Sequence, residues 1–194
     1  MRWIGLVLLE SIVIFVLQNY CHELGYTHSE YKRFQENLEA NITKEIVAFP
    51  IPIEFQARIS YTDSYLEKRS DGLHKACDIM DKENTSGEIP ILSMTDGVVT
   101  NLGWLYLGGY RIGVTSESGL YYYYAHLHSY AEGLEVGDRV VAGQLLGFMG
   151  NTGQGEEGMT NQFDVHLHVA IYYDDIEGVE KNVNLYPFLR KLQE

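Results

Sequence analysis

The clearest pattern in the chain is an alternation of apolar and polar residues from Phe163 to Val169. The apolar positions that alternate with His166 and His168 would share one face of a β-strand, and the two histidines would share the other. Two imidazoles on one strand face are a common arrangement for binding a transition metal, or for one metal ligand and one proton-handling group. The competing interpretation is a half-buried strand with histidines on its polar face, because a His-x-His pair is a weak signal.

From about residue 86 onward, short apolar runs alternate with glycine-containing turns, which is typical of β-structure. Turns are predicted at Asp96-Gly97, at Gly108-Gly109 and at Glu117-Ser118-Gly119. Asp-Gly is a strong hairpin signal, so the first turn should join the apolar runs 89–94 and 98–102 as a β-hairpin. The polar, glycine-rich stretch 151–162 is predicted to form a flexible wall of the cleft that the histidines line.

The part of the chain before residue 86 has a different pattern. Apolar residues recur at helical spacing among polar ones, which predicts a solvated amphipathic helix. These apolar positions are Tyr31, Phe34, Leu38 and Ile42. Two prolines in the segment 49–53 favour an extended backbone, because each disfavours helix in the residue before it. We therefore predict a helical connector at residues 19–49 and a separate domain at residues 50–194.

Residues 1–18 are predicted to form a signal-anchor or signal segment. The stretch 3–17 is apolar apart from Gly5, Glu10 and Ser11, and Arg2 precedes it. It is shorter than the roughly 20 residues of a spanning helix, but no small-x-small cleavage site follows it. We expect a single-pass anchor in the cell membrane, with the bulk of the chain outside the cytoplasm. Secretion after cleavage, or a buried helix of a soluble domain, are the alternatives.

Composition narrows the choice of partners. The chain has 194 residues, enough for one domain with a sizeable core and an appendage. Its formal net charge of −13 argues against nucleic acid as a partner. The two cysteines, Cys21 and Cys77, define no disulfide framework. Cys77 is expected to be a small buried residue rather than a metal ligand.

A second candidate ligand set lies upstream, where His74 and Asp78 are four residues apart. Zinc binds nitrogen, sulfur and carboxylate ligands, and a catalytic zinc typically takes three protein ligands and leaves a fourth position for water. A His-x-x-x-Asp pattern also arises often by chance, so on its own it does not identify a metal site.

Four motifs in order resemble one family. They are His74-x-x-x-Asp78, Tyr124-Ala125-His126-Leu127, the glycine framework from Val136-Gly137-Asp138 to Thr152-Gly153, and His166-Leu167-His168. Together they resemble the lysostaphin/LytM-like zinc peptidases, which cut peptidoglycan stem or cross-bridge peptides. The resemblance covers roughly residues 70 to 190. Two positions depart from the family pattern: Ala76 stands where the family usually has glycine, and Val165 where it often has proline.

The resemblance implies a mainly β fold, a small antiparallel β-domain of LytM-like, barrel-sandwich type with a long groove. It implies a zinc-dependent endopeptidase with a peptidoglycan peptide as substrate. One Zn²⁺ per chain would be held by His74, Asp78 and His168. His126 and His166 would be the catalytic pair, which handles the proton of the attacking water and contacts the developing oxyanion. The sequence leaves open which histidine has which role.

The sequence also contains a decoy, because His126-Leu127-His128 repeats the pattern of His166-Leu167-His168. The family position that matches His128 has no required role, and we expect this side chain near a strand end and close to solvent. Tyr122 and Tyr124 alternate with His126, so they are expected either to line the groove with it or to pack within the sheet.

Two other functional classes remain open at this stage. One is a catalytically inactive, membrane-tethered LytM-like module that binds cell-wall peptide or regulates a partner hydrolase. The other is a lipoyl-like or phosphocarrier β-domain, suggested by the repeated glycine turns. That domain would need an exposed lysine at a hairpin tip or one phosphorylated histidine, and it gives no reason for His74 and Asp78.

Overall fold

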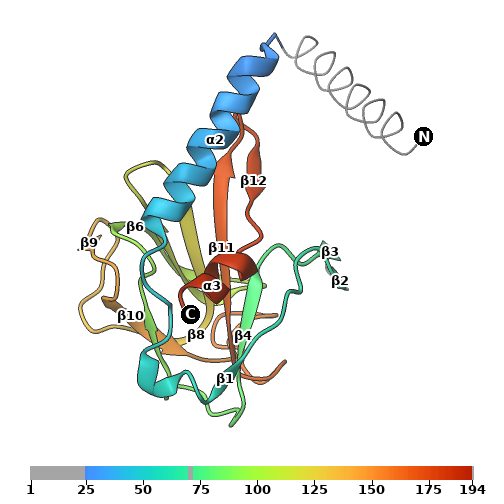
Figure 1. The fold of residues 1–194 in the computed structure, drawn as a ribbon. Helices are drawn as coiled ribbons and strands as arrows, with labels where there is room; N and C mark the ends of the chain where they lie inside the picture. Colours follow the sequence, from blue (N-terminus) through green and yellow to red (C-terminus); the bar gives the residue numbers. More distant parts are fainter. Residues whose placement is uncertain (1–24, 70–71, 194) are drawn as a thin grey trace.

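A computed structural model describes residues 25–69 and 72–193, and its centre is a ten-stranded antiparallel sheet (Figure 1). The main ladder has the order β1-β4-β11-β8-β7-β6-β9; β10 pairs with β5 and β8, and β12 with β11. A separate two-stranded sheet consists of β2 and β3. The strands are β1 (Ile59–Ser60), β2 (Lys68–Arg69), β3 (Gly72–Leu73), β4 (Cys77–Asp81), β5 (Pro90–Leu92), β6 (Gly97–Leu105), β7 (Gly109–Thr115), β8 (Tyr121–Tyr130), β9 (Arg139–Val140), β10 (Leu145–Met149), β11 (His166–Asp174) and β12 (Glu180–Asn182). The helices are α2 (His28–Glu45), the 3-10 turn η1 (Ile53–Phe55) and α3 (Tyr186–Lys191).

The alternation that stands out in the sequence forms β11. Leu167 and Val169 are fully buried and belong to the apolar core, while His166 and His168 on the opposite face line a groove. A strand with one apolar and one polar face must bury the first to be stable, so the core fixes which way the histidines point. The mainly β, antiparallel fold class is therefore confirmed.

The predicted connector helix is α2. Its N-terminus is closed by a capping box, in which the Thr27 side chain accepts from the backbone N–H of Glu30 and the Glu30 side chain accepts from the backbone N–H of Thr27. Figure 1 shows α2 beside β11 and β12, where the Phe34 ring lies 6.5 Å from that of Tyr173. Ile42 is buried in the same core as the strands. The last turns of α2 are thus packed against the β-domain.

The described ranges contain no helix that is both long enough and apolar enough to cross a membrane. The predicted anchor, residues 1–18, lies outside those ranges.

The turn predictions have a mixed outcome. Turns at Gly108-Gly109 and Glu117–Gly119 join β6 to β7 and β7 to β8, as expected. The predicted hairpin at Asp96-Gly97 is wrong, because β5 pairs with β10 whereas β6 pairs with β7 and β9. Gly97 serves close strand packing instead, since a Cβ there would lie 2.6 Å from the Thr115 carbonyl oxygen. The carboxylate of Asp96 accepts from the backbone N–H of Ala142 at 2.8 Å.

Candidate metal centre and active site

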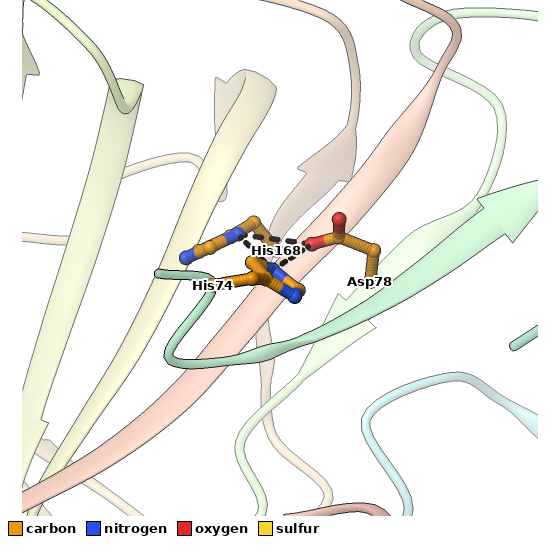
Figure 2. Close-up of side chains that lie close together, drawn as sticks. All are labelled: His74, Asp78 and His168. Atoms are coloured by element: carbon orange, nitrogen blue, oxygen red, sulfur yellow. Dashed lines mark hydrogen bonds and ion pairs between the residues drawn. The ribbon is translucent and has the colours of Figure 1, made fainter. Parts of the chain in front are cut away.

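The side chains of His74 and Asp78 converge on one point with that of His168, which is about 90 residues further along the chain (Figure 2). Asp78 Oδ1 lies 2.9 Å from His168 Nδ1 and 3.1 Å from His74 Nε2, and the two nitrogens are 3.3 Å apart. Asp78 and His168 are direct cross-strand partners in the β4–β11 ladder, so the strand register alone brings them together. His74 approaches from the segment between β3 and β4 and is buried.

The chemistry and spacing of these atoms fit zinc. Zinc binds imidazole nitrogen and carboxylate oxygen at about 2.0–2.2 Å, so the ligand atoms of a tetrahedral site lie roughly 3.3 Å apart. The three separations here are 2.9, 3.1 and 3.3 Å. No other group of at least three histidine, cysteine or acidic side chains comes together in this way within residues 25–69 and 72–193.

The orientation of the His74 ring is fixed by contacts of its Nδ1, the nitrogen that points away from the cluster. Its Nδ1 lies 3.2 Å from the Ser64 carbonyl oxygen and 3.0 Å from the Ser64 hydroxyl. A carbonyl oxygen can only accept, so Nδ1 carries the proton and Nε2 is the nitrogen available to a metal. A backbone partner of this kind gives no signal in the sequence, and Ser64 was not predicted.

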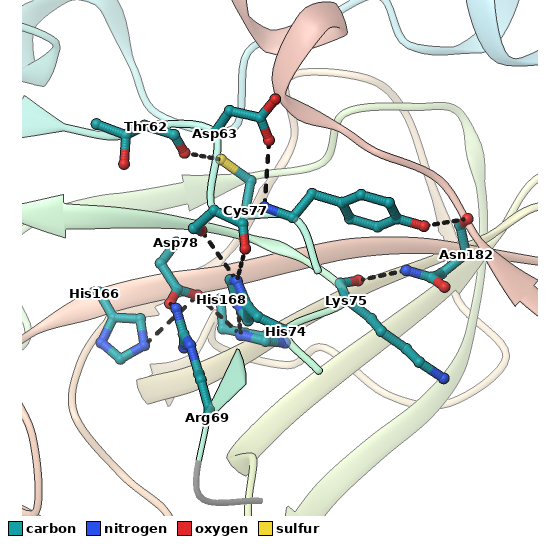
Figure 3. A network of polar contacts seen from close by, with 12 residues as sticks. Thr62, Asp63, Arg69, His74, Lys75, Cys77, Asp78, His166, His168 and Asn182 are labelled. Carbon is teal, nitrogen blue, oxygen red and sulfur yellow. Dashed lines mark hydrogen bonds and ion pairs between the residues drawn. The ribbon is translucent and has the colours of Figure 1, made fainter. Parts of the chain in front are cut away.

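The Asp78 carboxylate is held ionised, as a metal ligand must be. Burial acts to raise its pKa, but the polar contacts with His168 and His74 outweigh burial and hold the pKa well below its usual range. Its second oxygen, Oδ2, receives an ion pair from Arg69 Nη2 at 2.8 Å (Figure 3). Arg69 comes from β2, five residues before His74, and no sequence pattern indicated its role.

His126 and His166 lie beside this cluster as a pair, with ring centroids 4.6 Å apart. Each has Nδ1 2.8 Å from a backbone carbonyl, that of Thr152 for His126 and that of Asp164 for His166. Both Nδ1 atoms therefore donate, and each Nε2 is left as an acceptor. Burial, and then the neighbouring His166 and His168, lower the pKa of His126 to about 3. Burial is also the main cause that lowers the pKa of His166. Both rings are neutral at pH 7 and able to accept a proton.

His126 reaches the groove because the backbone is irregular at this point. Between the pairs Tyr110↔Leu127 and Ile112↔Tyr124, one residue of β7 opposes two residues of β8, which is a β-bulge. His126 itself has φ +62, in the left-handed region that costs a non-glycine residue about 1–2 kcal/mol. The bulge ends the regular alternation and turns the imidazole toward His166.

Of the two expectations for Tyr122 and Tyr124, packing within the sheet is confirmed, and for the same reason neither residue lines the groove. Both are fully buried in the core, and the Tyr124 hydroxyl accepts from the backbone N–H of Met94 at 2.9 Å. Their neighbours Tyr121 and Tyr123 line the groove instead. Because the bulge inserts one extra residue, tyrosines at odd positions share a face with the histidine at position 126.

The groove around the cluster has a volume of about 590 Å³. Gln154, from the predicted wall 151–162, lines it, together with Phe163 at the end of that loop. The Phe163 ring lies 4.5 Å from that of His126 and 5.0 Å from that of His166, which shields the pair from solvent. Cys77 faces away from the groove and is buried, and Ala76 has no left-handed backbone angle that would call for the glycine usual in the family.

A β-groove that brings two histidines and an aspartate together beside two neutral histidines has the ligands and the proton acceptors that a metallopeptidase site requires. Residues 72–183 match the model of Peptidase family M23, and because this is more than half of the chain, the protein belongs to that family. The resemblance to LytM-like peptidoglycan endopeptidases is confirmed.

Individual proteins that are similar to this chain agree with the family assignment. The L-Ala–D-Glu endopeptidase of Bacillus subtilis (strain 168) is 35% identical over 146 residues, which cover 74% of this chain and 43% of that protein. The crystal structure of a provisionally named glycyl-glycine endopeptidase lytM from Ruminococcus gnavus superposes with a TM-score of 0.71 at 51% identity, covering 77% of this chain and 61% of that one. Lysostaphin from Staphylococcus simulans shares the fold, with a TM-score of 0.55 at 24% identity over 75% of this chain and 55% of that one. The chain thus spans less than two thirds of the length of each of these proteins.

Proposed function

We propose that this protein is a zinc-dependent endopeptidase that hydrolyses peptide bonds in peptidoglycan stem or cross-bridge peptides. The observation that carries the proposal is the convergence of His74, Asp78 and His168 on one point, with their ligand atoms within 4.8 Å of one another. Its position beside two neutral imidazoles, in a groove of about 590 Å³, supports hydrolysis rather than a purely structural metal.

In this proposal His74 Nε2, Asp78 Oδ1 and His168 Nδ1 hold the metal. Zinc bound there would polarise the scissile carbonyl and lower the pKa of a bound water toward 7. His166 shares the strand face of His168, and its Nε2 lies 3.9 Å from Asp78 Oδ1, so it is placed to accept the proton of the nucleophile and return it to the leaving amine (Figure 3). His126 stands next to it to hydrogen-bond the developing oxyanion or share the proton.

Arg69 and Ser64 position the ligands. Arg69 holds Asp78 Oδ2, so that the other oxygen points toward the histidines, and Ser64 fixes the proton of His74 on Nδ1. Partners of this kind tune metal affinity, and their loss typically lowers it about 10- to 100-fold.

The substrate class is supported by the relatives, whose names describe cleavage of the L-Ala–D-Glu and glycyl-glycine bonds. The test is to dialyse the purified full chain, measure its zinc content, and follow the release of amino groups from purified peptidoglycan. One zinc per chain together with new amino termini is the expected result. Stoichiometric zinc without any release of amino groups would instead favour the inactive binding module.

We also propose that the domain lies outside the cytoplasm, tethered through residues 1–18. The proposal is supported by the apolar character of the stretch 3–17 and by the location of peptidoglycan. Protease added to intact wall-less cells should degrade the domain. Degradation only after lysis would reject this topology.

A further inference from the structure

Arg111 of β7 is a charged residue of the groove with no role in the site described above. It is half-buried and lines the same groove as the histidines. Its Nε and Nη1 are buried and have no hydrogen-bond partner among the described residues. Arg58 and Arg69, by contrast, are each paired with a carboxylate, at 2.7 Å to Asp81 and 2.8 Å to Asp78. Buried guanidinium nitrogens without a hydrogen-bond partner are costly, so such atoms usually have a partner in the functional complex.

The position of Arg111 relates it directly to the reaction centre. It is the single residue of β7 that faces the bulge formed by Ala125 and His126 on β8. The backbone feature that turns His126 into the groove therefore also sets the distance to Arg111. Burial raises the pKa of Tyr123 and the charge of Arg111 acts to lower it, and the Tyr123 ring centroid lies 6.1 Å from that of His168. Because Arg111 lies opposite His126 on the neighbouring strand, their backbones are about one strand spacing, roughly 4.8 Å, apart. An extended peptide advances about 3.5 Å per residue, so a residue one or two positions from the scissile bond can reach Arg111.

The charged side chains of the groove wall indicate the charge of the ligand that the groove favours. The whole chain has a net charge of −13, yet the groove wall carries Arg69, Lys75 and Arg111 against the one carboxylate of Glu180 within the described residues. Arg69 is neutralised by Asp78, and Lys75 is exposed on the rim, where solvent screens it. Arg111 is left as the partly desolvated cation. A guanidinium in such a place binds a carboxylate best, through two parallel hydrogen bonds.

We propose that Arg111 is a carboxylate-binding residue of the substrate groove, which selects peptides with a free carboxylate within two residues of the scissile bond. The proposal rests on the proposed peptidase function and narrows its substrate class. Stem peptides whose glutamate keeps its α-carboxylate satisfy the requirement. Amidated stem peptides and glycine cross-bridges do not.

The test measures binding, which requires no turnover. Three ligands, each with its C-terminal carboxyl amidated, are titrated calorimetrically into the zinc-loaded full chain: a stem tripeptide that ends in lysine and has the free glutamate α-carboxylate, the same tripeptide with that group as an amide, and pentaglycine. The wild type should bind the free carboxylate roughly tenfold or more tightly than either of the others. Arg111→Gln should bring the ratio close to one, and Arg111→Lys should lie between, because it keeps the charge and loses the paired hydrogen bonds.

The matched control is Arg139→Gln, which removes the same charge from an exposed position on β9, outside the groove, and should keep the wild-type ratio. Equal binding of the carboxylate and the amide by the wild type overturns the proposal, as does a ratio that survives in Arg111→Gln. If Arg111→Gln does not fold, the wild-type ratio and its decrease in Arg111→Lys decide. A carboxylate preference without peptidoglycan hydrolysis would reject the peptidase function alone, and hydrolysis without the preference would reject only the role of Arg111.

Discussion

The molecule contains the sequence His-Leu-His twice, on neighbouring strands, and uses it in two different ways. On β11 both histidines face the groove, and the strand runs regularly along β4 and β8. On β8 only His126 faces the groove; His128 is exposed, with its Nδ1 3.0 Å from the Ser86 hydroxyl. The middle leucine is fully buried in both tripeptides, so the two have the same pattern of burial. They differ in how many of their histidines reach the groove.

The difference lies in the pairing of each strand. β8 pairs with β11 only as far as Ala125, and from Leu127 onward it pairs with β10. His126 lies where the strand leaves one partner for the other, in a left-handed conformation, so His126 and His128 belong to two differently oriented halves of β8. Two-residue spacing therefore predicts a shared site only while a strand keeps its partner and register.

The largest effect is expected from the regular pair. His168→Ala removes one of three proposed ligands and leaves Asp78 and His74 to hold the metal alone. We expect zinc content after dialysis and peptidase activity both to be lost, and Asp78→Ala to behave alike. Metal analysis of the dialysed variants measures this directly. Unchanged zinc in either variant would remove that residue from the ligand set.

The next effect separates the two strands. His126→Ala should retain zinc, because none of the proposed ligands is changed, and should lose peptidase activity on the order of a hundredfold or more, the scale of an acid–base or oxyanion group. Zinc content and the initial rate of amino-group release, measured on the same preparation, give both values. Loss of zinc from this variant would mean that His126 is itself a metal ligand.

Elements that follow from hydrophobic periodicity could be predicted from the sequence, whereas the pairing of strands that are distant in the sequence could not. The alternation of β11 and the helical spacing of α2 were readable because burial of one face fixes each element. The five candidate site residues were indicated by the family resemblance, and the structure brings all five together. Two predictions were wrong for one cause: the partner strand of residues 89–94, and the strand face shared by Tyr122, Tyr124 and His126. Strand pairing and bulges depend on backbone that is distant in the sequence. They therefore leave no local signal at a non-glycine residue such as His126.

A smaller effect tests the bulge itself. His126→Gly and His126→Ala both remove the imidazole, but only glycine adopts φ +62 without a steric cost. We expect the glycine variant to be more stable than the alanine variant by about 1 kcal/mol, which corresponds to roughly 2–4 °C in Tm for a domain of this size. Thermal unfolding of the two proteins side by side measures the difference. A glycine variant that is equal or less stable would show that the left-handed backbone at this position carries no strain.

The smallest effect is expected at the second histidine of β8. His128 is exposed and lies outside the metal cluster, and its side chain lies against the loop at Ser86 and Gly87. His128→Ala should therefore keep zinc content and activity near wild type and change the free energy of unfolding by about 0.5 kcal/mol or less. Its value lies in the comparison with His168→Ala, since the two histidines occupy the same place in identical tripeptides. If His128→Ala lost the metal while His168→Ala kept it, the strand pairing described for β8 and β11 would have to be exchanged.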